Sequence, residues 1–145
     1  MQDKTYQLFT IGTIEKTGKD ARLRIHANYR DGLDGLEDFS HIKVFWWFDR
    51  NDVQKTKDGR PFRGRLKAHP PMAHGKEVGI FASRSPHRPN LIGITTCKIE
   101  NIDIEEGIID IDFTQAFEKS PIIDIKPYIP KIDKVEDATI PDWLK

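Results

Sequence analysis

Two arginines lie in a proline-rich segment, SRSPHRPN, which spans residues 83–90 between two apolar runs. Its two prolines fix the backbone torsion at their own positions and bias the preceding residues toward extended conformations, so we expect a stiff loop. A stiff loop loses less entropy when a ligand binds. The guanidinium groups of Arg84 and Arg88 could offer planar donor pairs to a carboxylate or a phosphate. An ordinary arginine-rich surface turn is the alternative interpretation.

A second unusual segment, SPIIDIKPYIP, spans residues 120–130. Lys126 and Tyr128 flank Pro127, which again restricts the backbone. Because side chains alternate along a strand, Asp124 and Lys126 are expected on the same side. This segment therefore holds an acid, a base and an aromatic ring close together.

The formal net charge is zero, but the charges are unevenly distributed. Basic residues dominate between Gln54 and Gly79, and acidic residues dominate after Lys98. The basic residues of the first stretch are Lys55, Lys57, Arg60, Arg63, Arg65, Lys67 and Lys76. A local basic stretch predicts an anionic partner, although two solvated loops of opposite charge would give the same pattern.

Several classes of site and location are not supported by the sequence. The five histidines show no paired ligand spacing and a single cysteine, Cys97, cannot build a zinc site or an internal disulfide, so we expect no metal. No glycine-rich phosphate loop, nucleophile elbow or dinucleotide fingerprint is found. No apolar run suggests a signal or a membrane anchor, which predicts a soluble, cytoplasmic protein.

Period-two alternation of apolar residues dominates the chain and predicts an all-β protein. The 145 residues fit one domain, 1–145, with a polar tail from about residue 131 that carries Ile140, Trp143 and Leu144. Strands are expected at residues 6–15, 22–27, 41–49, 77–83, 91–105, 107–113 and 121–126. Residues 29–40 are expected to form a short helical turn or a structured loop. Seven short strands favour a small closed or nearly closed β-barrel, because closure removes sheet edges.

Three segments in this order, GLDGLEDFSHIKVFWWFD, FASRSPHRPNLIGIT and DIKPYIP, closely resemble the TrmO-type family of S-adenosylmethionine-dependent tRNA methyltransferases, also called TsaA-like or YaeB-like. The resemblance runs from about Ile11 to Asp133. It implies a small β-barrel, usually a homodimer, that binds S-adenosyl-L-methionine near the subunit interface. The reaction it implies is methylation of the exocyclic amine of threonylcarbamoyl-adenosine, next to the tRNA anticodon.

The resemblance also assigns roles to individual residues. The positions that match cofactor contacts are Asp49, Arg50, Arg84, Ile94, Gln115, Ala116, Phe117 and Glu118. Arg88, Asn90, Lys126 and Tyr128 match residues expected near the cofactor or the tRNA, and we assign them to the substrate. We further expect Lys55, Lys57 and Arg60 to contact phosphates of the anticodon loop, and Asp124 to accept the proton that the amine loses.

The chain departs from the family pattern at several positions. Gln115, Glu118 and Lys119 replace an aspartate pair and a glycine, Asp49 replaces a histidine, and Leu91 replaces a proline. The typical N-terminal Pro-Arg-Gln motif is not found in the sequence, and we expect a short form without the extra C-terminal domain. These departures leave two alternatives: a module that binds S-adenosylmethionine or RNA without turnover, and a methyltransferase with a substrate other than tRNA.

Overall fold

The computed structural model describes residues 4–52 and 65–145. The chain divides into two compact units. The first comprises Met1–Trp47 and Ile94–Tyr128, and the second comprises Phe48–Gly93 and Ile129–Lys145. The expectation of one domain over residues 1–145 stays a prediction.

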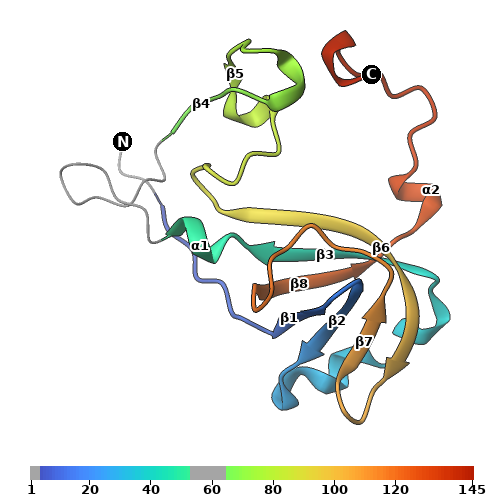
Figure 1. Cartoon of the computed structure of the whole chain (residues 1–145). Coiled ribbons are helices and arrows are strands. Elements are labelled where there is room, and N and C mark those ends of the chain that lie inside the picture. Colours follow the sequence, from blue (N-terminus) through green and yellow to red (C-terminus); the bar gives the residue numbers. More distant parts are fainter. Residues whose placement is uncertain (1–3, 53–64) are drawn as a thin grey trace. The chain divides into compact units, whose positions relative to one another are not determined.

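The first unit contains a closed β-barrel, as the alternation predicted (Figure 1). Its strands are β1 (Gly12–Thr17), β2 (Asp20–Ile25), β3 (His41–Trp47), β6 (Ile92–Asp103), β7 (Ile108–Ile111) and β8 (Pro121–Pro127). Neighbouring strands follow the order β1-β2-β7-β6-β3-β8 around the barrel, and β8 pairs with β1 to close it. Two 3-10 helices connect β2 to β3, η1 (Ala27–Leu33) and η2 (Leu36–Asp38), where the short helical turn was expected.

Every second residue of the strands points into the barrel. Ile14, Leu23, Ile42 and Ile109 are completely buried there, as the period of two requires. Cys97 also points inward, and burial, with a smaller contribution from the charge of Asp112, raises the pKa of its thiol to about 12. The thiol therefore stays protonated at neutral pH and acts as a small apolar side chain.

A β-bulge changes the alternation in β8. Val44 pairs with Ile125 and Trp46 pairs with Ile122, so β8 has one more residue than β3 between these two pairs. The bulge lets Ile122 point into the barrel while Asp124 and Lys126 are exposed. The expected common side for Asp124 and Lys126 is thus confirmed.

The second unit has little regular structure. Its elements are α1 (Asp49–Asp52), β4 (Lys67–Ala68), η3 (Pro71–Ala73), β5 (Val78–Gly79), η4 (Ile80–Ala82), α2 (Pro130–Asp133) and η5 (Asp142–Leu144). β4 and β5 form a separate two-stranded sheet. Among the described residues, no helix has the length and apolar character needed to cross a membrane.

Two predicted strands differ from the structure. The strand expected over residues 77–83 is confined to Val78–Gly79 and then becomes the 3-10 helix η4. The strand expected over residues 6–15 begins only at Gly12, and Tyr6, Leu8 and Phe9 are exposed. Tyr6, Leu8 and Phe9 have no neighbouring strand that covers them, whereas Ile80 is buried but lies in a 3-10 helix, so alternation alone overstated both strands.

Candidate functional site

In the first unit, four of the residues predicted to contact a cofactor form one short segment, residues 115–118, that is fastened to β6. The hydroxyl of Thr95 donates a hydrogen bond of 2.8 Å to Oε1 of Gln115 and lies 3.1 Å from Oγ1 of Thr114. Ala116 is buried and donates its N–H to Oγ1 of Thr114. Ile94 precedes Thr95 on β6, and because side chains alternate along a strand, its side chain points to the opposite face from that of Thr95.

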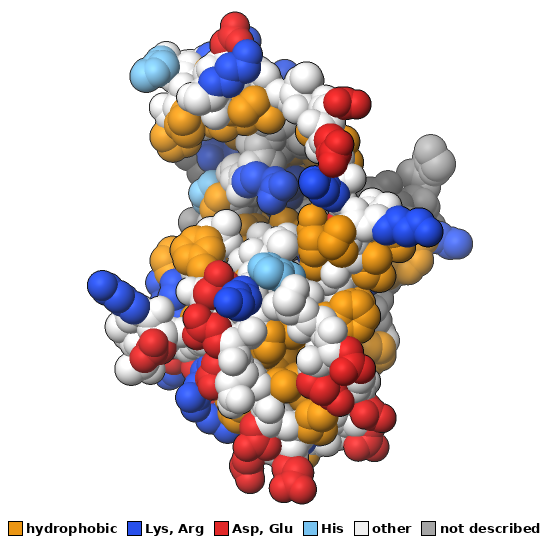
Figure 2. All heavy atoms as spheres, turned by 90° about the vertical axis from the view of Figure 1, so that its right-hand side faces the viewer, with side chains coloured by type: hydrophobic (Ala, Val, Ile, Leu, Met, Phe, Trp, Pro, Cys, Tyr) orange, Lys and Arg blue, Asp and Glu red, His pale blue; other side chains and the backbone are white. Residues whose placement is uncertain are grey.

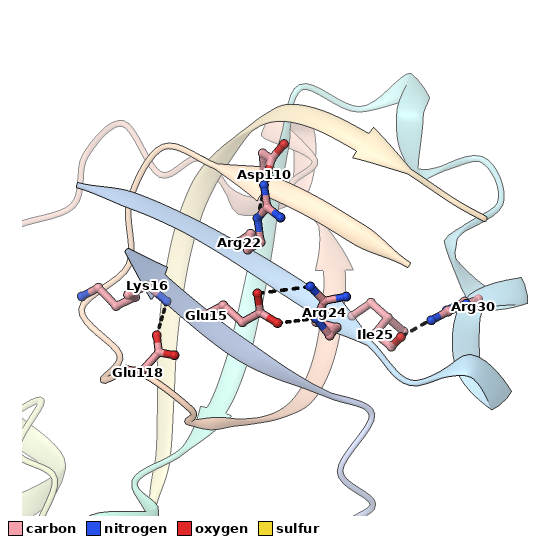
Figure 3. A network of polar contacts seen from close by, with 8 residues as sticks. All are labelled: Glu15, Lys16, Arg22, Arg24, Ile25, Arg30, Asp110 and Glu118. Atoms are coloured by element: carbon pink, nitrogen blue, oxygen red, sulfur yellow. Dashed lines mark hydrogen bonds and ion pairs between the residues drawn. The ribbon is translucent and has the colours of Figure 1, made fainter. Parts of the chain in front are cut away.

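Lys16 on β1 holds both ends of the same segment. Its backbone N–H donates to the carboxylate of Glu118, and its Nζ donates to the carbonyl oxygen of Thr114 at 3.2 Å. Figure 3 shows the Glu118 carboxylate beside the backbone N of Lys16, whose side chain points away from it, near the Glu15–Arg24 ion pair. The hydrogen bond from Arg24 lowers the pKa of Glu15. The segment is thus anchored to β1 and β6, while Phe117 remains 56% exposed.

In the second unit, residues 83–90 form an ordered turn that we call the proline loop. Arg88 donates from Nη1 to the carbonyl oxygens of Ser83 and Ser85, at 3.1 and 3.2 Å. The hydroxyls of Ser83 and Ser85 accept from the backbone N–H groups of Ser85 and His87. Arg88 therefore stiffens the loop from within, and its assignment to the substrate stays a prediction.

Arg84 is placed differently from Arg88. Its side chain is exposed, and within the described part of the chain it makes no hydrogen bond or ion pair. The structure thus separates a loop-forming arginine, Arg88, from one whose donors remain available to a ligand.

The helix α1, which carries Asp49 and Arg50, is attached to the same loop. Nδ2 of Asn51 lies 3.5 Å from Nδ1 of His87, and Phe48 donates its N–H to the carbonyl of Leu91 at 2.8 Å. Asp49 and Arg50 are exposed on α1, as is Asn90 in the loop. The second unit therefore brings together the predicted residues at positions 49, 50, 84, 88 and 90.

A third group of predicted residues lies on the outer face of β3 and β8. Lys126 pairs directly with Lys43, and Nζ of Lys43 lies 5.7 Å from the ring centroid of Tyr128. The rings of Tyr128 and His41 meet edge-on, with centroids 6.3 Å apart. Two lysines placed opposite each other repel, which an anion between them would relieve. The arrangement suits a phosphate contact.

Asp124 lies apart from the segment 115–118. It is exposed, and its Oδ1 accepts the backbone N–H of Ile125 at 2.9 Å. It lines a cavity of about 490 Å³ together with Tyr29, Asp34 and Phe39 of the β2–β3 connection, and residues 115–118 do not line this cavity.

The basic residues Lys55, Lys57 and Arg60 lie outside the described residues. In the first unit, the end of β6 and the turn to β7 carry Asp103, Glu105 and Glu106. Figure 2 shows acidic side chains at the bottom of the view, and Figure 1 also places the β6–β7 turn at the bottom. In the described ranges, 4–52 and 65–145, no three His, Cys, Asp or Glu side chains form a group that could hold a metal.

The sequence interpretation missed the residues that support the site. Thr95 and Thr114 are 3% exposed, and a threonine facing inward within an apolar strand pattern is a signal that could have found Thr95. His41 and Lys43 alternate with the buried residues of β3, so their outward direction was readable from the period of two. Lys16 gave no such signal, because its backbone N–H and its Nζ meet residues 114–118 only in the folded barrel.

A family model described as the tRNA-methyltransferase O N-terminal domain matches residues 12–134. The chain belongs to this family. Its barrel also superposes on the crystal structure of TrmO from Pseudomonas aeruginosa with a TM-score of 0.70 and 23% identity, covering 95% of this chain and 61% of the other. The fold is therefore the TrmO-type barrel that the sequence resemblance implied.

Two curated relatives of this TrmO-type chain differ greatly in length. A human protein named tRNA (adenine(37)-N6)-methyltransferase is 37% identical over 120 residues, which is 83% of this chain and 25% of the human protein. A probable S-adenosyl-L-methionine-binding protein of Methanocaldococcus jannaschii is 39% identical over 129 residues, which is 88% of this chain and 96% of that protein. The chain thus spans about a quarter of the human relative and nearly the whole archaeal one.

Proposed function

We propose that this chain is an S-adenosyl-L-methionine-dependent methyltransferase. Its substrate would be the exocyclic amine of threonylcarbamoyl-adenosine, next to the anticodon of tRNA. The observation that carries the proposal is the family match over residues 12–134. The name of the human relative supports the tRNA adenine, and the name of the archaeal relative supports the cofactor.

S-adenosylmethionine has a carboxylate, an ammonium, a sulfonium and an adenine, and each unit, taken by itself, holds groups that suit some of them. Within the second unit, the guanidinium group of Arg84 suits the carboxylate and the carboxylate of Asp49 suits a positive group, with Arg50 beside Asp49 on α1. The first unit offers the partly buried side chain of Ile94 and the amide of Gln115. Because Oε1 of Gln115 already accepts from Thr95, its NH₂ group is left to donate.

S-adenosylmethionine supplies an electrophilic methyl group bound to a sulfonium. The adenine amine forms the new N–C bond as the C–S bond breaks, and the amine then loses a proton. The chain contributes mainly by aligning the amine with the methyl group and excluding water, which can lower the barrier by about 7–11 kcal/mol. The anchoring of residues 114–118 by Lys16 and Thr95 suits this role, because a fixed segment holds its ligand in one orientation.

Asp124 is our candidate for the carboxylate that accepts this proton. If it does, Asp124→Asn lowers kcat about a hundredfold, a typical effect of losing a general base, while the Kd of S-adenosylhomocysteine stays unchanged. The matched control is Asp34→Asn, which neutralises the other carboxylate of the same cavity. Single-turnover methyl transfer measures both variants, and an unchanged kcat for Asp124→Asn would remove Asp124 from the mechanism.

We assign the phosphate contacts to Lys55, Lys57 and Arg60. Replacing all three by Gln is expected to weaken tRNA binding and to reduce the slope of log K against log salt, by about 0.7–0.9 for each phosphate that the variant no longer neutralises. Cofactor affinity should not change. Lys131→Gln, an exposed lysine on α2, controls for the removal of positive charge. An equal reduction of cofactor and tRNA affinity in the triple variant would count against this surface.

A second function is favoured by one observation. The archaeal relative that this chain matches over 96% of its length is named only as a binding protein. The chain would then hold S-adenosylmethionine or RNA without turnover. Calorimetry with S-adenosylmethionine, followed by transfer of labelled methyl groups to bulk tRNA, separates the two functions. Binding without label in RNA would favour the binding module, and label in protein or small molecules would indicate a different substrate.

We also propose a homodimer in the cytoplasm, where its tRNA substrate would be found. The exposed side chains of Tyr6 and Phe9, at 82% and 66%, offer apolar surface for a second copy. Analytical ultracentrifugation would contradict the dimer if only monomers sedimented at micromolar concentration.

A further inference from the structure

A cavity of about 690 Å³ lies entirely within the second unit, between the proline loop, η3 and the C-terminal helix η5. This volume is in the range typical of small-molecule sites, about 300–1,000 Å³. Its lining includes Met72 from η3, Phe81 from η4, and Trp143 and Leu144 from η5. Among the described lining residues, Arg84 is the only one that was assigned above to the cofactor or the substrate.

The end of the chain is fixed at this cavity. η5 packs against η3, and Leu144 donates its N–H to the carbonyl of Pro141 at 3.0 Å. Lys145 and Asp142 form an ion pair of 2.8 Å that closes the same turn. Trp143 is consequently held half-buried in the cavity wall, while the preceding residues 134–142 are exposed.

The chemistry of the lining selects for an anion with a flat aromatic group. Phe81 is 80% exposed and Met72 is 50% exposed, so the cavity presents apolar surface that a ligand could bury. The charged or titratable groups among the described lining residues are Arg65, His69, Arg84 and His87, with no carboxylate. The carboxylate of Glu77 lies 3.6 Å from His69, but Glu77 is outside the lining.

We propose that this cavity binds one nucleotide of the RNA substrate, with its base stacked on Trp143 and its phosphate beside Arg65 and the two histidines of the lining, while Arg84 stays assigned to the cofactor. The proposal rests on the proposed function and specifies a substrate subsite for it. Bases stack on aromatic side chains without regard to sequence, and phosphates are drawn to basic groups. S-adenosylmethionine fits this cavity less well, because its sulfonium and ammonium would find no carboxylate among the described lining residues.

The test compares Trp143→Ala, Trp143→Phe and the control Ile140→Ala, which alters the same tail outside the cavity. The RNA probe is a synthetic anticodon stem-loop, with binding followed by fluorescence anisotropy at fixed salt. Trp143→Ala should weaken RNA binding about tenfold or more, the effect typical of removing one stacking partner. Trp143→Phe should keep most of the affinity, and Ile140→Ala all of it. Phe81→Ala serves as a second variant, because so exposed a side chain contributes little to folding.

The affinity for S-adenosylhomocysteine, measured by calorimetry, is expected to be the same in all variants. RNA affinity that is unchanged in Trp143→Ala would overturn the subsite, and so would an equal reduction for S-adenosylhomocysteine. Wild-type protein that binds the stem-loop through Trp143 but transfers no methyl group would leave the subsite standing and reject the methyltransferase. Methyl transfer with RNA binding independent of Trp143 would reject the subsite alone.

Discussion

Arg84→Ala should strongly weaken cofactor binding and reduce methyl transfer with it. Arg84 is the arginine of the proline loop whose guanidinium makes no hydrogen bond or ion pair among the described residues. Removing one partner of a charge-assisted pair costs about 2–5 kcal/mol, so the Kd of S-adenosylmethionine should rise roughly 30-fold or more. Calorimetry with S-adenosylhomocysteine measures this effect without turnover.

Two variants make the Arg84 result specific. Arg22→Ala removes an arginine that pairs with Asp110 at 3.2 Å on the barrel surface, and it should leave cofactor binding unchanged. Arg88→Ala should instead lower thermal stability, because it releases the carbonyls of Ser83 and Ser85. Normal cofactor affinity in Arg84→Ala would show that this arginine does not contact the cofactor.

Gly12→Ala should strongly destabilise the barrel. Gly12 is buried where β1 pairs with both β2 and β8. A Cβ atom added there would come within 2.3 Å of the carbonyl oxygen of Arg24 and 3.1 Å of Cα of Ile25, and backbone atoms cannot move aside independently. Overpacking typically costs about 1–3 kcal/mol and occasionally more, so the free energy of unfolding should fall by about 3 kcal/mol.

The melting temperature should then fall by about 10 °C, given a shift of roughly 2–4 °C for each kcal/mol in a domain of this size. Circular dichroism measures the melt. Gly32→Ala is the matched control, since nothing lies within 4 Å of its added Cβ, and its stability should stay the same or rise slightly. Equal melting temperatures for Gly12→Ala and the wild type would contradict the close approach of β1 and β2.

The barrel was predictable because the apolar alternation within each strand and the glycine in a turn are visible in the sequence. The alternation of Ile42, Val44 and Trp46 in β3 specifies an inner face, and Gly18, with a φ of 60°, marks the turn between β1 and β2. The failures at residues 6–11 and 80–83 have a common cause. Alternation detects an extended apolar segment, but whether a neighbouring strand is present to pair with it depends on the tertiary structure.

Within the candidate site, the sequence predicted the proline loop, but it did not predict which residues hold the site in place. Prolines and arginines are visible in the sequence, but nothing there distinguishes Arg84 from Arg88. That difference arises when the loop folds and the carbonyls of Ser83 and Ser85 turn toward Arg88. Trp143 and Leu144 stand out in the sequence as apolar residues of a polar tail, but their packing site on η3 arises only in the folded unit.

The most direct test of the central claim is nucleoside analysis after the reaction. The wild-type chain is incubated with S-adenosylmethionine carrying an isotopically labelled methyl group and with tRNA from a host that lacks the modification, and the RNA is digested for mass spectrometry. The label is expected on the exocyclic amine of threonylcarbamoyl-adenosine, and it should be strongly reduced with Arg84→Ala. Bound S-adenosylmethionine with no labelled nucleoside would contradict the proposed methyltransferase.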